Sequence, residues 1–345
     1  MVPVFVPACS SSLSLHSPHA RLHRLPYSDR TPLLGLIRNQ GYTFKEMNTL
    51  ATRILGMSRI KPAIALLLAV LMLAGCTSAF VYNRLDWLIP WYVDGYMDLT
   101  RDQRQALQEQ LGPTLEWHRE EELASYIEIL DHIETSVDGP VDAAWVRERI
   151  DEMLAAAERI ERSMLEVALE FGAEVSGEQM KEFIASRWEE QREYEDEYAE
   201  RTDEEYADDD YDNISEFLKR FLGRLTAEQK AVIREASASL QRFDHAWLED
   251  RHQWLENLEP LLQREEGWQE AVMDLYRSRK QNRAPAYTEA YENNLAIISE
   301  AVSKVIGMMT EEQERRAVKE IDDLRRKIQK LIEDRQKEAS RTYPK

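Results

Sequence analysis

Apolar residues recur at helical spacing through most of the chain. The clearest stripe repeats at intervals of four and three residues over about thirty residues, a spacing that places its members on one face of a helix. Its members are Val146, Ile150, Met153, Ala157, Ile160, Met164, Val167 and Phe171. We therefore expect one long helix in this region.

Four further stripes predict helices elsewhere. Their apolar positions are Leu123, Tyr126, Leu130 and Ile133; Ile233, Ala236, Leu240, Phe243, Trp247, Trp254 and Leu258; Tyr287, Tyr291, Ile298, Val302 and Val305; and Ile321, Leu324, Ile328 and Leu331. The first stripe continues a helix that begins near Thr100, which Gly112-Pro113 is expected to kink or divide. The second predicts another long helix, with Asp250 breaking its apolar stripe. No segment shows the alternation that is typical of a strand.

Turn signals separate these helices. They lie at Asp138-Gly139-Pro140, between Gly172 and Gly177, at Glu259-Pro260 and at Ala284-Pro285. Each stripe is apolar on one side only, so the helices must bury their stripes against one another. Narrow stripes suit nearly antiparallel packing. The sequence therefore predicts an all-α domain over residues 99–345, built as an elongated bundle of long antiparallel helices.

One segment of this domain is dominated by acidic residues. Residues 189–212 read EEQREYEDEYAERTDEEYADDDYD and hold 14 Asp and Glu against Arg192 and Arg201. Asp208, Asp209 and Asp210 could offer oxygen ligands to Ca²⁺, but the segment lacks the ligand spacing and the turn glycine of an EF-hand. We expect a solvated or mobile acidic linker here.

The apolar run before this domain has a different character. Residues 57–75 combine a short basic start at Arg59 and Lys61 with an apolar stretch over 64–73, which is shorter than the roughly 20 residues of a membrane-spanning helix. The run ends in Leu73-Ala74-Gly75-Cys76. A buried helix with an incidental cysteine is the competing interpretation, but the apolar run does not continue beyond Cys76.

These residues resemble the signal peptide and lipobox of bacterial lipoproteins. The resemblance implies that Leu73, Ala74 and Gly75 precede a cleavage point, and that the Cys76 thiol carries a covalent lipid. No other cofactor is expected. Residues 1–46 have no helical period and are rich in Ser, Pro, His and Arg. We expect residues 1–56 to be a disordered or mis-annotated upstream segment, with translation starting at Met47 or Met57.

Charge constrains the partners of the remaining chain. The full chain has a formal net charge of −20, and residues 1–75 hold 8 Lys and Arg but only 2 Asp and Glu. Residues 76–345 therefore carry 36 Lys and Arg against 62 Asp and Glu, a net charge of −26. Such a chain repels nucleic acid and anionic lipid head groups, so attachment to a membrane should come from acyl chains. Thr77, in place of an Asp, indicates the outer membrane facing the periplasm.

Aromatic residues crowd the segment 76–98 that follows the cysteine. They are Phe80, Tyr82, Trp87, Trp91, Tyr92 and Tyr96. Such residues serve either as large core side chains or as membrane-interface anchors. We expect Trp87 and Trp91 to lie in the core, with the face nearest the anchor touching lipid.

The same stretch carries a second resemblance. YNRLDWLIPWYVDGYMDLTRDQ, residues 82–103, is similar to the opening signature of an uncharacterised family of proteobacterial all-helical lipoproteins. The resemblance implies an outer-membrane location and an all-helical fold. It implies no activity.

Three short motifs begin predicted helices. They are Leu99-Thr100-Arg101-Asp102-Gln103, Leu225-Thr226-Ala227-Glu228-Gln229 and Met309-Thr310-Glu311-Glu312-Gln313. They resemble the LTxxQ motif of periplasmic stress chaperones, which implies a helical cradle for unfolded clients. The alternative is that each Thr-x-x-Gln is only a helix-capping box, in which the Thr and Gln side chains satisfy free backbone N–H groups.

Motifs of catalysis are sparse. We find no phosphate-binding Gly loop, no nucleophile elbow and no HExxH motif. His245, Glu249 and His252 share one helical face and could hold a metal ion. A solvated polar face beside the apolar face of Trp247 and Trp254 is the favoured interpretation. His118 and His132 are interpreted as helix-surface residues.

The sequence thus predicts a protein that is not an enzyme and has a binding role in the cell envelope, chaperone-like or scaffolding. Its expected partners are the membrane, through the lipid on Cys76, and an envelope protein or an unfolded client, but no nucleic acid. The alternative is a metal-binding bundle or metal-dependent hydrolase that uses His245, Glu249 and His252.

Overall fold

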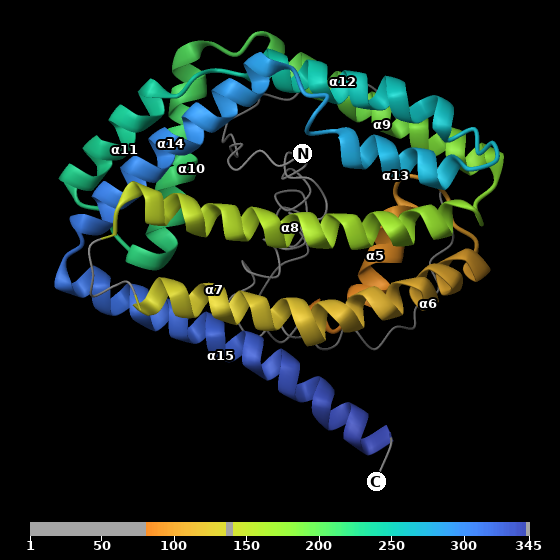
Figure 1. The fold of residues 1–345 in the computed structure, drawn as a ribbon, viewed down its shortest axis with the longest axis horizontal. Helices are drawn as coiled ribbons and strands as arrows, with labels where there is room; N and C mark the ends of the chain where they lie inside the picture. Colours follow the sequence, from red (N-terminus) through yellow and green to blue (C-terminus); the bar gives the residue numbers. More distant parts are fainter. Residues whose placement is uncertain (1–80, 136–140, 343–345) are drawn as a thin grey trace, which may run out of the picture.

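The computed structural model describes residues 81–135 and 141–342, and within these ranges every regular element is a helix (Figure 1). The all-α fold class is confirmed. The residues of the predicted lipobox, Leu73 to Cys76, lie outside the described residues, as do all of residues 1–80 and the predicted turn Asp138-Gly139-Pro140. Among the described helices, none is long and apolar enough to cross a membrane.

The helices follow one another with short connections. They are α5 (Leu85–Asp94), α6 (Arg101–Trp117), a π-helical turn η2 (His118–Glu122), α7 (Leu123–Thr135), α8 (Ala143–Gly172), α9 (Gly177–Ala199), α10 (Asp203–Leu222), α11 (Ala227–Ser239), α12 (Asp244–Leu261), α13 (Trp268–Ser278), α14 (Pro285–Gly307) and α15 (Glu311–Thr342).

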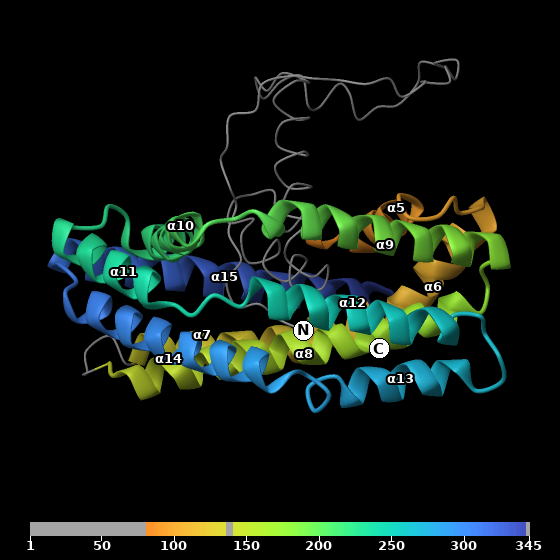
Figure 2. The same cartoon turned by 90° about the horizontal axis from the view of Figure 1, so that it is seen from above.

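Helix α8 lies lengthwise through the molecule, while α10 runs across the long axis (Figures 1 and 2). Helix α8 packs against α6 at one end and α14 at the other, and α15 lies along α7. The apolar core follows this arrangement. One cluster centres on Leu111, Leu123 and Val272, and a second at the opposite end on Ile233 and Val305.

Helix α8 spans 30 residues, as its stripe predicts. Val146, Ile150, Ala157, Val167 and other stripe members are buried. Met153 is an exception because its side chain is exposed. The gap between α8 and α9 and the start of α14 at Pro285 also lie where the turn signals predict them.

The acidic segment 189–212 corrects the expectation of a linker. It is helical in α9 and α10, apart from a short break at 200–202. Tyr194 and Tyr198 are buried four residues apart in α9, and Tyr206 is buried in α10. These tyrosines give each helix a buried side despite the many charges.

The long helix expected from Ile233 to Leu258 is interrupted. Helix α11 ends at Ser239 and α12 begins at Asp244. The side chain of Asn294 in α14 satisfies the backbone of Gln241 in this break: its Oδ1 accepts from the Gln241 N–H at 2.7 Å, and its Nδ2 donates to the Gln241 carbonyl at 2.7 Å. Because a distant side chain replaces the helical hydrogen bonds, the local sequence does not reveal the break.

The two proline signals have different outcomes. Helix α6 continues through Gly112-Pro113 to Trp117, so this pair does not divide it, whereas α12 ends at Leu261, directly after Glu259-Pro260. Irregular geometry appears instead at the π-helical turn His118–Glu122 that joins α6 to α7.

Candidate functional site: paired helix caps and an exposed aromatic helix

Each of the three Thr-x-x-Gln motifs forms a reciprocal capping box. At the start of α6, the Gln103 N–H donates to Oγ1 of Thr100 at 3.2 Å, and the Thr100 N–H donates to Oε1 of Gln103 at 3.0 Å. Thr226 with Gln229 and Thr310 with Gln313 make the same two contacts at the starts of α11 and α15.

A fourth box of the same kind begins α9. The Gln179 N–H donates to Oγ of Ser176, and the Ser176 N–H donates to Oε1 of Gln179. The sequence reads Val175-Ser176-Gly177-Glu178-Gln179, so it differs from the other motifs mainly in having Ser for Thr. Allowing either hydroxyl residue at the cap would have revealed it.

The four boxes meet in two pairs. In the first pair, Nε2 of Gln103 donates to Oε1 of Gln179 at 2.9 Å, and Nε2 of Gln179 donates back to Oε1 of Gln103 at 2.8 Å. We call this pair the α6–α9 clasp. In the second pair, Gln229 and Gln313 exchange the same two hydrogen bonds at 3.0 and 2.9 Å. We call it the α11–α15 clasp.

Each glutamine also donates to the backbone that precedes its partner's cap. The accepting carbonyl belongs in every case to the residue two positions before the partner's cap residue: Glu174 for Gln103, Asp98 for Gln179, Met308 for Gln229 and Arg224 for Gln313. The two clasps are therefore equivalent in every one of these contacts, although they lie at opposite ends of the molecule (Figure 1).

The clasps explain why glutamine occupies the third helical position. A capping box accepts either Glu or Gln there. In a clasp, however, the side chain must accept from its own cap and also donate to its partner and to a carbonyl, and only the carboxamide can do both. Gln229 and Gln313 are 0% and 4% exposed, so these groups would otherwise be unsatisfied in the interior.

The apolar residue that precedes each cap is also internal. Leu99, Val175 and Leu225 are buried and Met309 is half-buried. In the described structure, the motifs therefore fasten pairs of helix starts together. Their glutamines and leading apolar residues do not form an open surface for a ligand.

Helix α5 presents a different kind of feature, an aromatic surface. Trp87 and Trp91 are 55% and 56% exposed, and Tyr92 beside them is also exposed. We call these three residues the α5 aromatic face. The result corrects the expectation that both tryptophans are core residues. Leu85 and Ile89 form the buried face of α5. Trp87 lies two residues from each of them and Trp91 lies two residues after Ile89, a spacing that places both tryptophans on the other side of the helix.

The end of α5 is fixed to α6 through one carboxylate. Oδ1 of Asp94 accepts from the Leu99 N–H at 2.9 Å and from Nη2 of Arg104 at 3.0 Å. The Leu99 N–H, together with Arg104, holds the pKa of Asp94 below its usual value.

The segment before α5 is fixed through His118. Nδ1 of this ring lies 2.8 Å from the hydroxyl oxygen of Tyr82, and Nε2 lies 3.2 Å from that of Tyr126. Burial, with a contribution from Arg119, lowers the pKa of His118 to about 4. His118 therefore corrects its interpretation as a surface residue, and it is neutral at pH 7.

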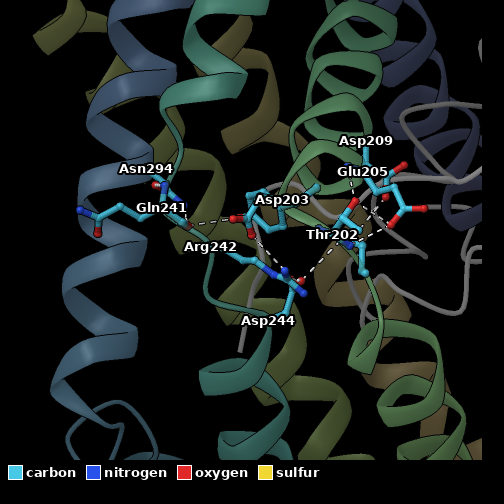
Figure 3. Close-up of polar contacts among 10 residues, drawn as sticks. Thr202, Asp203, Glu205, Asp209, Gln241, Arg242, Asp244 and Asn294 are labelled. Carbon is cyan, nitrogen blue, oxygen red and sulfur yellow. Dashed lines mark hydrogen bonds and ion pairs between the residues drawn. The ribbon is translucent and has the colours of Figure 1, made fainter.

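Buried and partly buried charges hold the acidic segment in place. Figure 3 shows Arg242 between two helices, with Nη1 3.0 Å from Oδ1 of Asp203 and Nε 3.1 Å from Oδ2 of Asp244. Arg201 lies 3.3 Å from Asp209 and 3.4 Å from Asp244. These ion pairs join the start of α10 to the start of α12.

Asp210 lies near these pairs, but none of the ion pairs among the described residues involves its carboxylate. It is buried, and in the part of the chain that the structure describes its Oδ2 has no hydrogen-bond partner. Burial raises the pKa of Asp210 to about 7, with Asp244 and Asp209 acting in the same direction and Arg201 opposing them. Its neighbours Asp208 and Asp209 pair with Arg234 and Arg201, so the three carboxylates do not converge as Ca²⁺ ligands would.

The predicted metal residues are not brought together either. His245 and Glu249 are exposed on α12, whereas His252 faces Glu195 at 3.2 Å and Glu256 at 3.5 Å. No group of three or more His, Cys, Asp and Glu that could hold a metal ion is found in the part of the chain that the structure describes.

Comparison with known proteins places part of the chain in one group. A model described as a family of unknown function (DUF6279) matches residues 95–291. The matched span contains the whole α6–α9 clasp, together with Thr226 and Gln229 of the other clasp. No curated protein and no solved structure matches the chain.

Proposed function

The chain belongs to DUF6279, a family of unknown function, and we propose that it is a lipid-anchored outer-membrane protein that faces the periplasm. Its proposed role is that of a scaffold without catalytic activity. The observation that carries this proposal is the order of the segments. A basic start, an apolar run and Leu73-Ala74-Gly75-Cys76 lead directly into the folded domain, whose helix α5 begins nine residues after Cys76.

Two further features support the location. The resemblance of residues 82–103 to proteobacterial lipoproteins agrees with a lipid on Cys76. The strongly acidic chain beyond Cys76 favours attachment through acyl chains over attachment through a basic surface.

The clasps favour a scaffold over a chaperone. A chaperone needs accessible apolar surface for its clients. The motif residues that resemble those of stress chaperones are instead engaged with one another, and Gln229, Gln313 and Leu225 are buried. The arrangement of His245, Glu249 and His252 gives no support to the metal-dependent alternative.

The anchor is tested by growing cells with a fatty-acid analogue and comparing wild type with Cys76→Ser. We expect label on the wild-type protein and none on Cys76→Ser, which should accumulate with its signal uncleaved. Cys9→Ser is the matched control and should keep the label. Equal labelling of wild type and Cys76→Ser would contradict the proposal.

The scaffolding role is tested with the wild-type protein and an unfolded test protein. We expect no suppression of aggregation, and specific crosslinks to folded envelope proteins in cells. Suppression at near-stoichiometric ratio would show that the chaperone role is the correct one.

A further inference from the structure

We infer that the α5 aromatic face rests in the head-group region of the membrane that holds the anchor, so that the protein contacts lipid through Trp87, Trp91 and Tyr92 as well as through its acyl chains. The inference rests on the proposed function and identifies the surface that faces the bilayer. It begins from the distribution of exposed apolar groups. Of the five large apolar side chains that are exposed in the described residues, three belong to α5.

Helix α5 is apolar on both sides. Leu85, Ile89 and Pro90 pack into the core, while Trp87 and Trp91 face outward. A helix that is apolar all round is normally covered on every side. Within residues 81–135 and 141–342, only one side of α5 is covered, so its other side is open to an occupant from outside these residues.

The exposure does not arise from loose attachment. The segment before α5 is held by the hydrogen bond between Tyr82 and His118, and its end is held by Asp94 with Leu99 and Arg104. The two indole rings are thus presented outward by a helix that is fixed at both ends.

The length of the chain points to lipid as the occupant. Leu85 lies nine positions after Cys76, and an extended chain of that length spans at most about 30 Å. A lipid on Cys76 therefore keeps the start of α5 within about 30 Å of the bilayer surface. A protein partner or a second copy would have to be recruited to the same place.

The chemistry of the face fits the head-group region. Trp and Tyr are enriched at membrane interfaces because their rings are apolar and their N–H and O–H groups can still reach water. Exposed Arg84 and Asp86 flank the face with opposite charges. The α5 aromatic face is therefore close to neutral, whereas the acidic surface elsewhere is repelled by anionic lipid.

The test uses the full lipidated protein reconstituted into phosphatidylcholine vesicles whose acyl chains carry bromine, which quenches nearby indole fluorescence. We expect quenching of the wild type, and loss of most of that quenching in Trp87→Phe/Trp91→Phe. The matched control is Trp145→Phe/Trp254→Phe, which changes two of the other tryptophans and should keep the quenching. Both variants retain an aromatic ring, and a thermal melt checks that each remains folded.

Two outcomes overturn the inference: no quenching of the wild type, or equal quenching of the wild type and Trp87→Phe/Trp91→Phe. Mass spectrometry of the Cys76 peptide from the same samples distinguishes a missing contact between α5 and lipid from a missing lipid anchor. If Cys76 is acylated but the tryptophans are not quenched, the anchor is retained and only the contact through α5 is ruled out. An unacylated Cys76 ends both proposals.

Discussion

Asp210 occupies a position where an ionised carboxylate is costly. It is buried in α10, and one of its oxygens has no hydrogen-bond partner. Its nearest cation, Arg201, is already engaged by Asp209 and Asp244. Proteins that keep such a group are stabilised when it takes up a proton, since the neutral acid costs less to bury.

This position gives a pH-dependent prediction. The pKa of Asp210 is raised to about 7 when folded, against about 4 in an unfolded chain. Between these values the folded state binds the proton and the unfolded state does not, so stability rises as pH falls. We expect Asp210→Asn to stabilise the protein at pH 8 by on the order of 3 kcal/mol, and the gain to shrink below pH 7 and vanish near pH 4.

Urea unfolding across this pH range measures the effect. Asp208→Asn, on the same helix but exposed and paired with Arg234, is the matched control and should change stability little at any pH. A gain for Asp210→Asn that does not vary with pH would show that the buried charge is not its cause.

At the scale of elements, the contributions of the two glutamines of a clasp to stability should depend on each other. In the α11–α15 clasp, each buried carboxamide depends on the other for two hydrogen bonds. Removing one partner leaves the other unsatisfied, so removing both should cost less than the sum of the single changes.

We therefore expect a double-mutant cycle of Gln229→Ala and Gln313→Ala to give a coupling energy of about 1–2 kcal/mol. The measurement is the free energy of unfolding of the wild type, both single variants and the double variant. Gln103→Ala and Gln179→Ala form the comparison cycle, and their coupling should be smaller because these side chains are only half-buried. Strict additivity in the α11–α15 cycle would argue against the clasp as a unit.

An element could be predicted from the sequence when the residues that determine it lie close together in the chain. The stripe of α8 and the starts of α6, α11 and α15 depend on residues a few positions apart, and the sequence displays them. The break before α12 depends on Asn294, more than fifty positions from Gln241, and no local pattern reports it. The same holds for the pairing of Gln103 with Gln179 and for the burial of His118 between Tyr82 and Tyr126.

At the scale of the whole molecule, the excess of negative charge opposes compactness. Residues 76–345 carry 62 Asp and Glu against 36 Lys and Arg. Several of the ion pairs, such as Arg162–Glu166, Lys181–Glu178 and Arg315–Glu311, lie at exposed positions, where each contributes little. Repulsion among the surplus carboxylates should therefore outweigh the attraction within pairs. Salt screens both the repulsion and the attraction, so the net effect of added salt should be to stabilise the folded protein.

We expect the melting temperature of a protein that comprises residues 76–345 to rise between about 20 mM and about 200 mM NaCl, as the screening length falls. Choline chloride at the same concentrations should give the same rise, which separates general screening from binding of sodium ions to the acidic helices. A melting temperature that falls with salt would show that the ion pairs dominate.

The equivalence of the two clasps also bears on ancestry. From the cap at Thr100, α6 and α7 follow with a π-helical turn between them, and from the cap at Thr226, α11 and α12 follow with a four-residue break between them. Further helices then lead to the other cap of each clasp, α8 in one case and α13 with α14 in the other. Such a repeated plan is what duplication of a gene segment would leave behind. If the two halves arose in this way, a single-copy homologue would match only one of them.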